Sequence, residues 1–155
     1  MYIKTINLIF LIFFIFSCSL NMKNNLDRNY NLKIETPTNK YNHLLSFELQ
    51  KFNKFNKNYE DTFFLEANIT FSSQETLTLN GLSPLYKMIG TIDYKLSKNN
   101  NNIKKGKISS TINYGSVTSY YGKEENQKFV KQRIVRNLAL KLLNKIKLII
   151  NKIEN

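Results

Sequence analysis

The sequence predicts an α+β fold, a two-layer sandwich in which two helices cover one face of a four-stranded mixed or antiparallel sheet, in the order β-α-β-β-β-α. Three observations predict it. Apolar and polar residues alternate in four stretches of the chain, as in strands with one buried face. In two other stretches apolar residues recur every three or four positions, as on one side of a helix. With 155 residues, 42% of them apolar, the chain is long enough for one domain and too short for two separate cores.

The first strand and the first helix are expected on either side of Pro37. Before it, Leu32 and Ile34 alternate with polar residues and are expected to point inward. After it, Thr38 or Asn39 can cap a helix that begins near Lys40. Its apolar stripe is interrupted by Glu48 and consists of Tyr41, Leu44, Leu45, Leu49, Phe52 and Phe55. The single histidine, His43, lies off the centre of this stripe and is expected at the surface.

Three further strands are expected between residues 63 and 114. The strictest alternation runs from Phe63 to Phe71 and predicts a strand with one buried face. Residues 72–84 are rich in Ser, Thr and Asn and are expected to form a long loop. Alternation resumes in 86–96 and in 108–114, with a turn at 99–102. Lys104, Lys105 and Lys107 would then make the tip of this hairpin basic.

A long amphipathic helix is expected from about Lys123 to Lys152, about 45 Å in length. Glu124 and Glu125 are expected in its first turn, where the helix dipole favours acidic residues. Such a basic helix can lie on a membrane or in a partner's groove. Because every strand has an apolar face that must be covered, we predict that it packs on the sheet. Its apolar face consists of Val130, Ile134, Leu138, Leu142, Ile146, Ile149 and Ile150.

The N-terminus has the three parts of a secretory signal peptide. Lys4 is followed by a mostly apolar stretch from Ile6 to Phe16 and by Ser17. The only cysteine, Cys18, comes next, and the four residues 15–18 resemble the lipobox of bacterial lipoproteins. We therefore predict a signal peptide at 1–17, lipid attachment at Cys18, a flexible tether at 18–29 and one domain at 30–155. An uncleaved signal anchor and a cysteine without function are the alternatives.

Composition limits the function classes. The formal charge is +12, and one Cys and one His leave no partners for a metal site or for most hydrolytic constellations. We find no pair of titratable groups suited to acid and base catalysis, so we expect no enzyme, no catalytic residues, no metal and no cofactor. The charge suggests an anionic partner. Export argues against nucleic acid, and a biased genome composition is a second explanation for the lysine excess.

The element order, behind a lipoprotein signal, resembles the LptE family of lipopolysaccharide-assembly lipoproteins. The resemblance covers about residues 18 to 150. Ser19, Lys in place of Arg and the 124–126 sequence depart from the family pattern. The segments that carry the resemblance are the leucine-rich first helix, Thr62–Ile69, Leu85–Leu96, Gly106–Ser110, Tyr120–Tyr121 and the helix from Asn126 to Ile149 with Arg136, Leu138, Ala139 and Ile146.

The resemblance implies a lipid-anchored protein on the periplasmic face of the outer membrane. Its implied partners are an LptD-like β-barrel, which it would plug and support, and lipopolysaccharide. Lys87 matches a position where the family tends to carry a basic residue. Charge alone adds Lys104, Lys105 and Lys107 as candidate contacts for lipid A phosphates. The alternative is another envelope lipoprotein that acts as an adaptor or binds an anionic envelope polymer.

Overall fold

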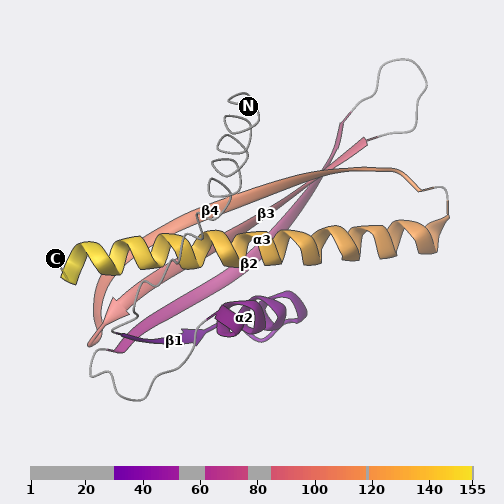
Figure 1. Ribbon diagram of the computed structural model, residues 1–155. Helices are drawn as coiled ribbons and strands as arrows, with labels where there is room; N and C mark the ends of the chain where they lie inside the picture. The colour runs from indigo at the N-terminus through magenta and orange to yellow at the C-terminus, as the bar shows by residue number, and fades with distance from the viewer. Residues whose placement is uncertain (1–29, 53–61, 77–84, 118, 155) are drawn as a thin grey trace, which may run out of the picture.

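The structure is a computed structural model that describes residues 30–52, 62–76, 85–117 and 119–154. The predicted element order is confirmed (Figure 1). The elements are β1 (Asn31–Glu35), α2 (Lys40–Phe52), β2 (Thr62–Thr76), β3 (Leu85–Lys98), β4 (Asn101–Gly115) and α3 (Tyr120–Glu154).

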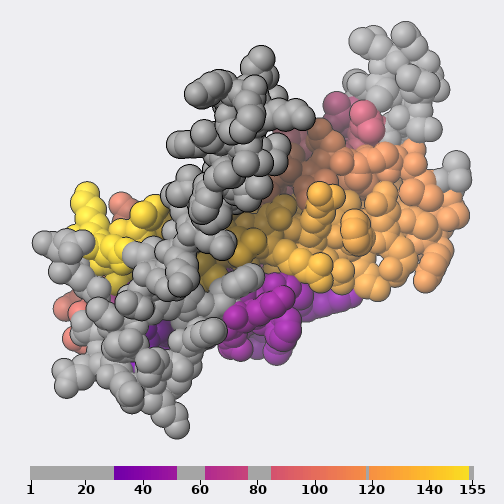
Figure 2. Space-filling model, viewed as in Figure 1, coloured from indigo at the N-terminus to yellow at the C-terminus, as the bar shows by residue number. Residues whose placement is uncertain are grey.

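The strands form one mixed sheet in the order β1-β2-β3-β4. β1 runs parallel to β2, and the other two pairs are antiparallel. Both helices lie on one face of the sheet, and α3 spans about 52 Å. The space-filling view shows α2 packed along one side of α3 (Figure 2). Among the described residues, no helix lies on the opposite face of the sheet.

The core lies between the sheet and the helices, and the predicted inward faces are confirmed. In the strands the buried side chains include Leu32, Phe63, Leu65, Ala67, Ile69, Met88, Ile92, Tyr94 and Leu96, with Phe71 half-buried. In α3 they include Val130, Ile134, Leu138, Leu142, Ile146 and Ile150. His43 is exposed, as predicted. Phe55 lies outside the described residues.

Several predicted boundaries are wrong because pairing between strands extends the sheet beyond the alternating segments. Residues 72–76, expected in a loop, pair with 85–89 and belong to β2. β4 begins at Asn101, directly after Asn99 and Asn100, whose φ angles are 50° and 63°. Two left-handed residues are the requirement of a tight hairpin turn, and asparagine tolerates them. The predicted basic hairpin tip is therefore a basic segment of strand.

The start of α3 also differs from the prediction, and Ser119 explains why. Its hydroxyl accepts a hydrogen bond from the backbone N–H of Gly122 at 3.0 Å, so Ser119 caps a helix that begins at Tyr120. Glu124 and Glu125 consequently lie beyond the first turn. At α2 the cap is Asn39, whose side-chain oxygen accepts from the N–H of Asn42 at 2.9 Å.

Asn42 joins α2 to the edge of β2. Pairing of β1 with β2 ends at Glu35 and Glu66, which leaves the next part of that edge without a strand. Asn42 is completely buried there. Its side-chain oxygen accepts from the N–H of Ile69 at 2.8 Å, and its amide donates to Asn68 at 2.9 Å. The Asn42 side chain thus supplies hydrogen bonds to a part of the β2 edge that no strand pairs.

An ion pair connects the two helices. Glu48, which interrupts the apolar stripe of α2, is 7% exposed. The Nε of Arg136 on α3 lies 3.2 Å from the carboxylate of Glu48, so this buried negative charge has a positive partner.

Replacing Arg136 with Met is expected to lower the free energy of unfolding by about 1–2 kcal/mol, because Glu48 would be left buried without its charged partner. The value is modest because Arg136 itself is mostly exposed. Urea unfolding of the purified protein measures it. Arg133→Met, at an exposed position of the same helix, is the matched control. Adding Glu48→Leu to Arg136→Met should restore stability, and a double variant less stable than Arg136→Met would contradict this account.

Candidate functional site

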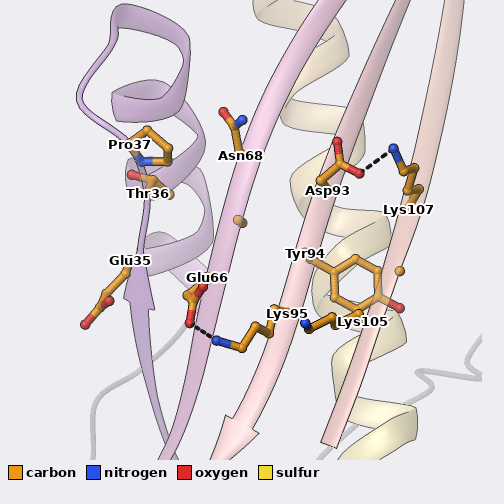
Figure 3. A pocket seen from close by; sticks show the side chains of 12 residues that line it. Glu35, Thr36, Pro37, Glu66, Asn68, Asp93, Tyr94, Lys95, Lys105 and Lys107 are labelled. Atoms are coloured by element: carbon orange, nitrogen blue, oxygen red, sulfur yellow. Dashed lines mark hydrogen bonds and ion pairs between the residues drawn. The ribbon is translucent and has the colours of Figure 1, made fainter. Parts of the chain in front are cut away.

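The helix-free face of the sheet carries a shallow groove of about 730 Å³ near the end of β1. Figure 3 views this face, with α3 behind the strands. Cross-strand register places the lining residues in rows, because side chains on one face recur every second residue. The charged residues of the groove are Glu35, Glu66, Asp93, Lys95, Lys105 and Lys107.

Most of this charge is compensated within the groove. The ammonium of Lys95 lies 2.6 Å from Glu66, and that of Lys107 lies 2.9 Å from Asp93 (Figure 3). Lys107, a predicted anion contact, is therefore paired with a carboxylate of the neighbouring strand. Among the described residues, Lys105 has no acidic partner within ion-pair distance. The groove is a mixed-charge surface, and it has no concentrated positive centre.

The four predicted lysines do not form one site. Lys105 and Lys107 lie on the helix-free face, but Lys104 pairs with Leu96 on the other face and is exposed at the free edge of β4. Lys87 pairs with Gln74 and Asn113 toward the opposite end of the sheet. It is eight residues along β3 from Lys95, the partner of Lys105, a separation of about 26 Å. Lys87 was predicted from the family resemblance and the other three lysines from charge, and neither argument places them relative to one another.

Exposed aromatic and aliphatic side chains occur where β3 begins, β4 ends and α3 starts, at the end of the sheet that carries Lys87. They are Leu85, Val117, Tyr120 and Tyr121, with Phe129 about two and a half turns further along α3. We call these five residues the aromatic end. Tyr120 is 79% and Tyr121 74% exposed. Exposed tyrosines gathered in one place are typical of surfaces that bind another protein.

Contacts among neighbouring side chains of β2, β3, β4 and α3 surround the aromatic end. Tyr86 and Tyr114 stack with ring centres 5.5 Å apart, and the ammonium of Lys123 lies 5.3 Å from the centre of the Tyr86 ring. The hydroxyl of Tyr114 lies 3.3 Å from that of Ser73. A hydrogen bond to Glu124 raises the pKa of the Tyr120 hydroxyl above its ordinary value. The contact of Lys123 with Tyr86 links the start of α3 to β3.

Cys18 lies outside the described residues. Within the described part of the chain, no helix combines the length and the apolar character that crossing a membrane requires. Nor do three or more His, Cys, Asp or Glu side chains of that part come together as a metal site would need.

Comparison with known proteins gives matches at the level of structure. No family model and no curated protein matches the sequence. Rare lipoprotein B from Shewanella oneidensis superimposes with a TM-score of 0.62 at 15% identity, over 81% of this chain and 99% of that chain. A minor lipoprotein from Acinetobacter baumannii gives 0.57 at 16% identity, over 79% and 92% of the two chains. A lipoprotein from Caulobacter crescentus gives 0.55 at 15% identity, over 78% and 91%. The chain thus has the fold of these lipoproteins, the LptE-like fold that the sequence resemblance implies.

Proposed function

We propose that the chain is an outer-membrane lipoprotein of the LptE type, anchored through Cys18 on the periplasmic face, which plugs and supports an LptD-like β-barrel during the assembly of lipopolysaccharide. The match to nearly the whole of rare lipoprotein B carries the proposal. The position of the only cysteine, directly after a signal-like apolar segment, supports it independently. The proposed role is binding and support, with no catalysed reaction.

In this role the aromatic end is the contact for the barrel. Tyrosine and phenylalanine supply large contact area at little cost in side-chain entropy, and they often dominate the energy of protein interfaces. Lys87 lies on the sheet close to this end and has no acidic partner within ion-pair distance among the described residues. It is our candidate for the contact with lipid A phosphates, which bind ammonium groups through charge-assisted hydrogen bonds.

The proposal is tested by purifying the C-terminally tagged chain from membranes in mild detergent. Mass spectrometry then identifies the partners and the N-terminal peptide. We expect an acylated Cys18 and a stoichiometric β-barrel. An acylated chain without a barrel would favour the adaptor or the binder of an anionic polymer. An intact Met1 would contradict the lipoprotein assignment.

Replacing Tyr120 and Tyr121 together with Ser is expected to reduce the recovered barrel by about tenfold or more, because central tyrosines of an interface often contribute 2 kcal/mol or more each. The matched control is Phe47→Ser, which removes an aromatic side chain that is 62% exposed on α2. It should leave recovery unchanged. Equal losses in both variants would show that the aromatic end is not the specific contact.

A further inference from the structure

Strand register aligns four charged side chains in one row across the helix-free face of the sheet. Glu35 of β1 pairs with Glu66 of β2. Glu66 pairs with Lys95 of β3, which pairs in turn with Lys105 of β4. All four line the groove, where Figure 3 shows them at one level of the sheet. From β1 to β4 the row carries two negative charges and then two positive charges, and we call these four residues the charge row.

This order of charges is unfavourable within a single chain. Like charges directly opposite each other destabilise a sheet, and the row contains two such pairs, at its β1–β2 end and at its β3–β4 end. The central pair is attractive, because the ammonium of Lys95 lies 2.6 Å from the carboxylate of Glu66. Among the described residues, neither Glu35 nor Lys105 has an oppositely charged side chain within ion-pair distance. A local arrangement that opposes stability in the isolated chain indicates a role in binding.

The charge row is complementary to a second copy of itself. Two copies can face each other about a twofold axis that runs parallel to the strands, between β2 and β3, and the row is then reversed on the second copy. Glu35 of each copy meets Lys105 of the other, and Glu66 of each copy meets Lys95 of the other, so four contacts between opposite charges form. A twofold axis along the row would instead place each charge on its own copy. Charge therefore selects the axis parallel to the strands.

The neighbouring rows of the face fit the same arrangement. In the next row, Asn68 of β2 would face Asp93 of β3 in the other copy, so an amide lies opposite a carboxylate. The row after that consists of the hydroxyls of Thr70, Thr91 and Ser109, the last two of which lie 3.1 Å apart. In neither row do like charges oppose each other across the two copies.

The face also has the area that a stable dimer needs. The strands β2, β3 and β4 have 15, 14 and 15 residues. With about 3.3 Å per residue and about 4.8 Å between strands, they present about 650 Å² on each copy. Interfaces of standard size bury about 600–1,000 Å² per partner. Sheets that pack face to face keep their strand directions within about 30° of each other, which an axis parallel to the strands provides.

We propose that the helix-free face is a dimer interface, on which a second copy of this chain docks through the charge row about a twofold axis parallel to the strands. The second copy is the occupant because its row supplies opposite charges at the same strand spacing. Most side chains of this face are polar, so the contact depends on charge and weakens as the salt concentration rises. The inference goes beyond the proposed function and does not require a barrel.

The test is co-capture of two differently tagged full-length chains that are co-expressed and extracted from membranes in mild detergent. Capture through one tag and quantitative detection of the other tag measure the pairing of copies. We expect the second chain to be recovered at low salt. In 1 M salt its recovery should fall about fivefold or more, because charges are then screened within about 3 Å. Absence of the second chain at low salt, or equal recovery at both salt concentrations, would overturn the inference.

Charge reversal at the two ends of the row makes the test specific. Glu35→Lys alone, or Lys105→Glu alone, places like charges together twice in the dimer and should reduce recovery about tenfold. Co-expression of the Glu35→Lys chain with the Lys105→Glu chain makes every contact of the row attractive again. Recovery should then return to within about twofold of the parent chain. This rescue also shows that both variant chains fold.

The matched control is Lys104→Glu, which reverses a charge at the neighbouring position of the same strand but on the other face of the sheet. It should leave recovery unchanged. A loss as large as that of Lys105→Glu would mean that net charge, and not the charge row, controls pairing, and the inference would fail. It would fail equally if the chains with reversed charges did not recover each other.

Discussion

Replacing Asn42 with Ala is expected to lower the free energy of unfolding by about 2–4 kcal/mol. The change removes two hydrogen bonds that a completely buried side chain makes to β2. It leaves the N–H of Ile69 buried without a partner, and an unsatisfied buried donor costs about 1–3 kcal/mol by itself. Because α2 would lose its polar attachment to the edge of the sheet, the amide of Ile69 should also exchange its hydrogen faster, in proportion to the lost free energy.

Two variants separate the hydrogen bonds of Asn42 from its volume. Asn42→Asp keeps an acceptor for the N–H of Ile69 but removes the donor to Asn68, and it should have an intermediate effect. His43→Ala, at the exposed neighbouring position, is the matched control and should change stability by less than about 0.5 kcal/mol. Urea unfolding provides the measurement. A loss below about 1 kcal/mol for Asn42→Ala would mean that these hydrogen bonds contribute little to holding α2 on the sheet.

Asn42 also shows where sequence patterns stop being informative. Periodicity predicts which residues of a helix face the core, and it was correct for Leu45 and Leu49, both completely buried. A periodicity pattern assigns asparagine to the surface. Whether a buried amide is stable depends on hydrogen-bond partners that the local sequence does not reveal. The bonding partners of Asn42, Asn68 and Ile69, are 26 and 27 residues further along the chain. The interruption of the stripe at Glu48 was visible, but its partner Arg136 is 88 residues away.

The candidate site was predicted less completely than the fold for the same physical reason. Charge counts identified a basic protein and basic residues in the segment that forms β4. Which face each lysine occupies depends on strand register, and a one-residue shift reverses it. The irregularity beside Leu96 and Ser97 lies next to Lys104, so spacing alone could not place that residue. The aromatic end combines residues of three elements, and local sequence patterns do not reveal that these elements meet.

The packing of α3 against Gly90 of β3 gives the second large effect. Gly90 lies in the centre of β3, and a Cβ built on it would overlap the Cγ2 methyl of Ile134. The same Cβ would lie 3.3 Å from the ring of Phe71 and 3.4 Å from Leu138. Ile134 and Leu138 are completely buried, so neither has space to move aside. We expect Gly90→Ala to lower the free energy of unfolding by about 1–3 kcal/mol, and Gly90→Val by more.

A compensating substitution distinguishes this overlap from a general effect of side chains in β3. Leucine has no Cγ2 branch on Cβ, so Ile134→Leu removes the overlapping methyl and should itself cost less than about 1.5 kcal/mol. The double variant Gly90→Ala with Ile134→Leu should be more stable than the sum of the single effects predicts, by about 1 kcal/mol or more. Gly115→Ala, where a Cβ meets nothing within 4 Å, is the matched control. Additive single effects would place the cost of Gly90→Ala outside its contact with Ile134, and the glycine would then be required by the strand itself.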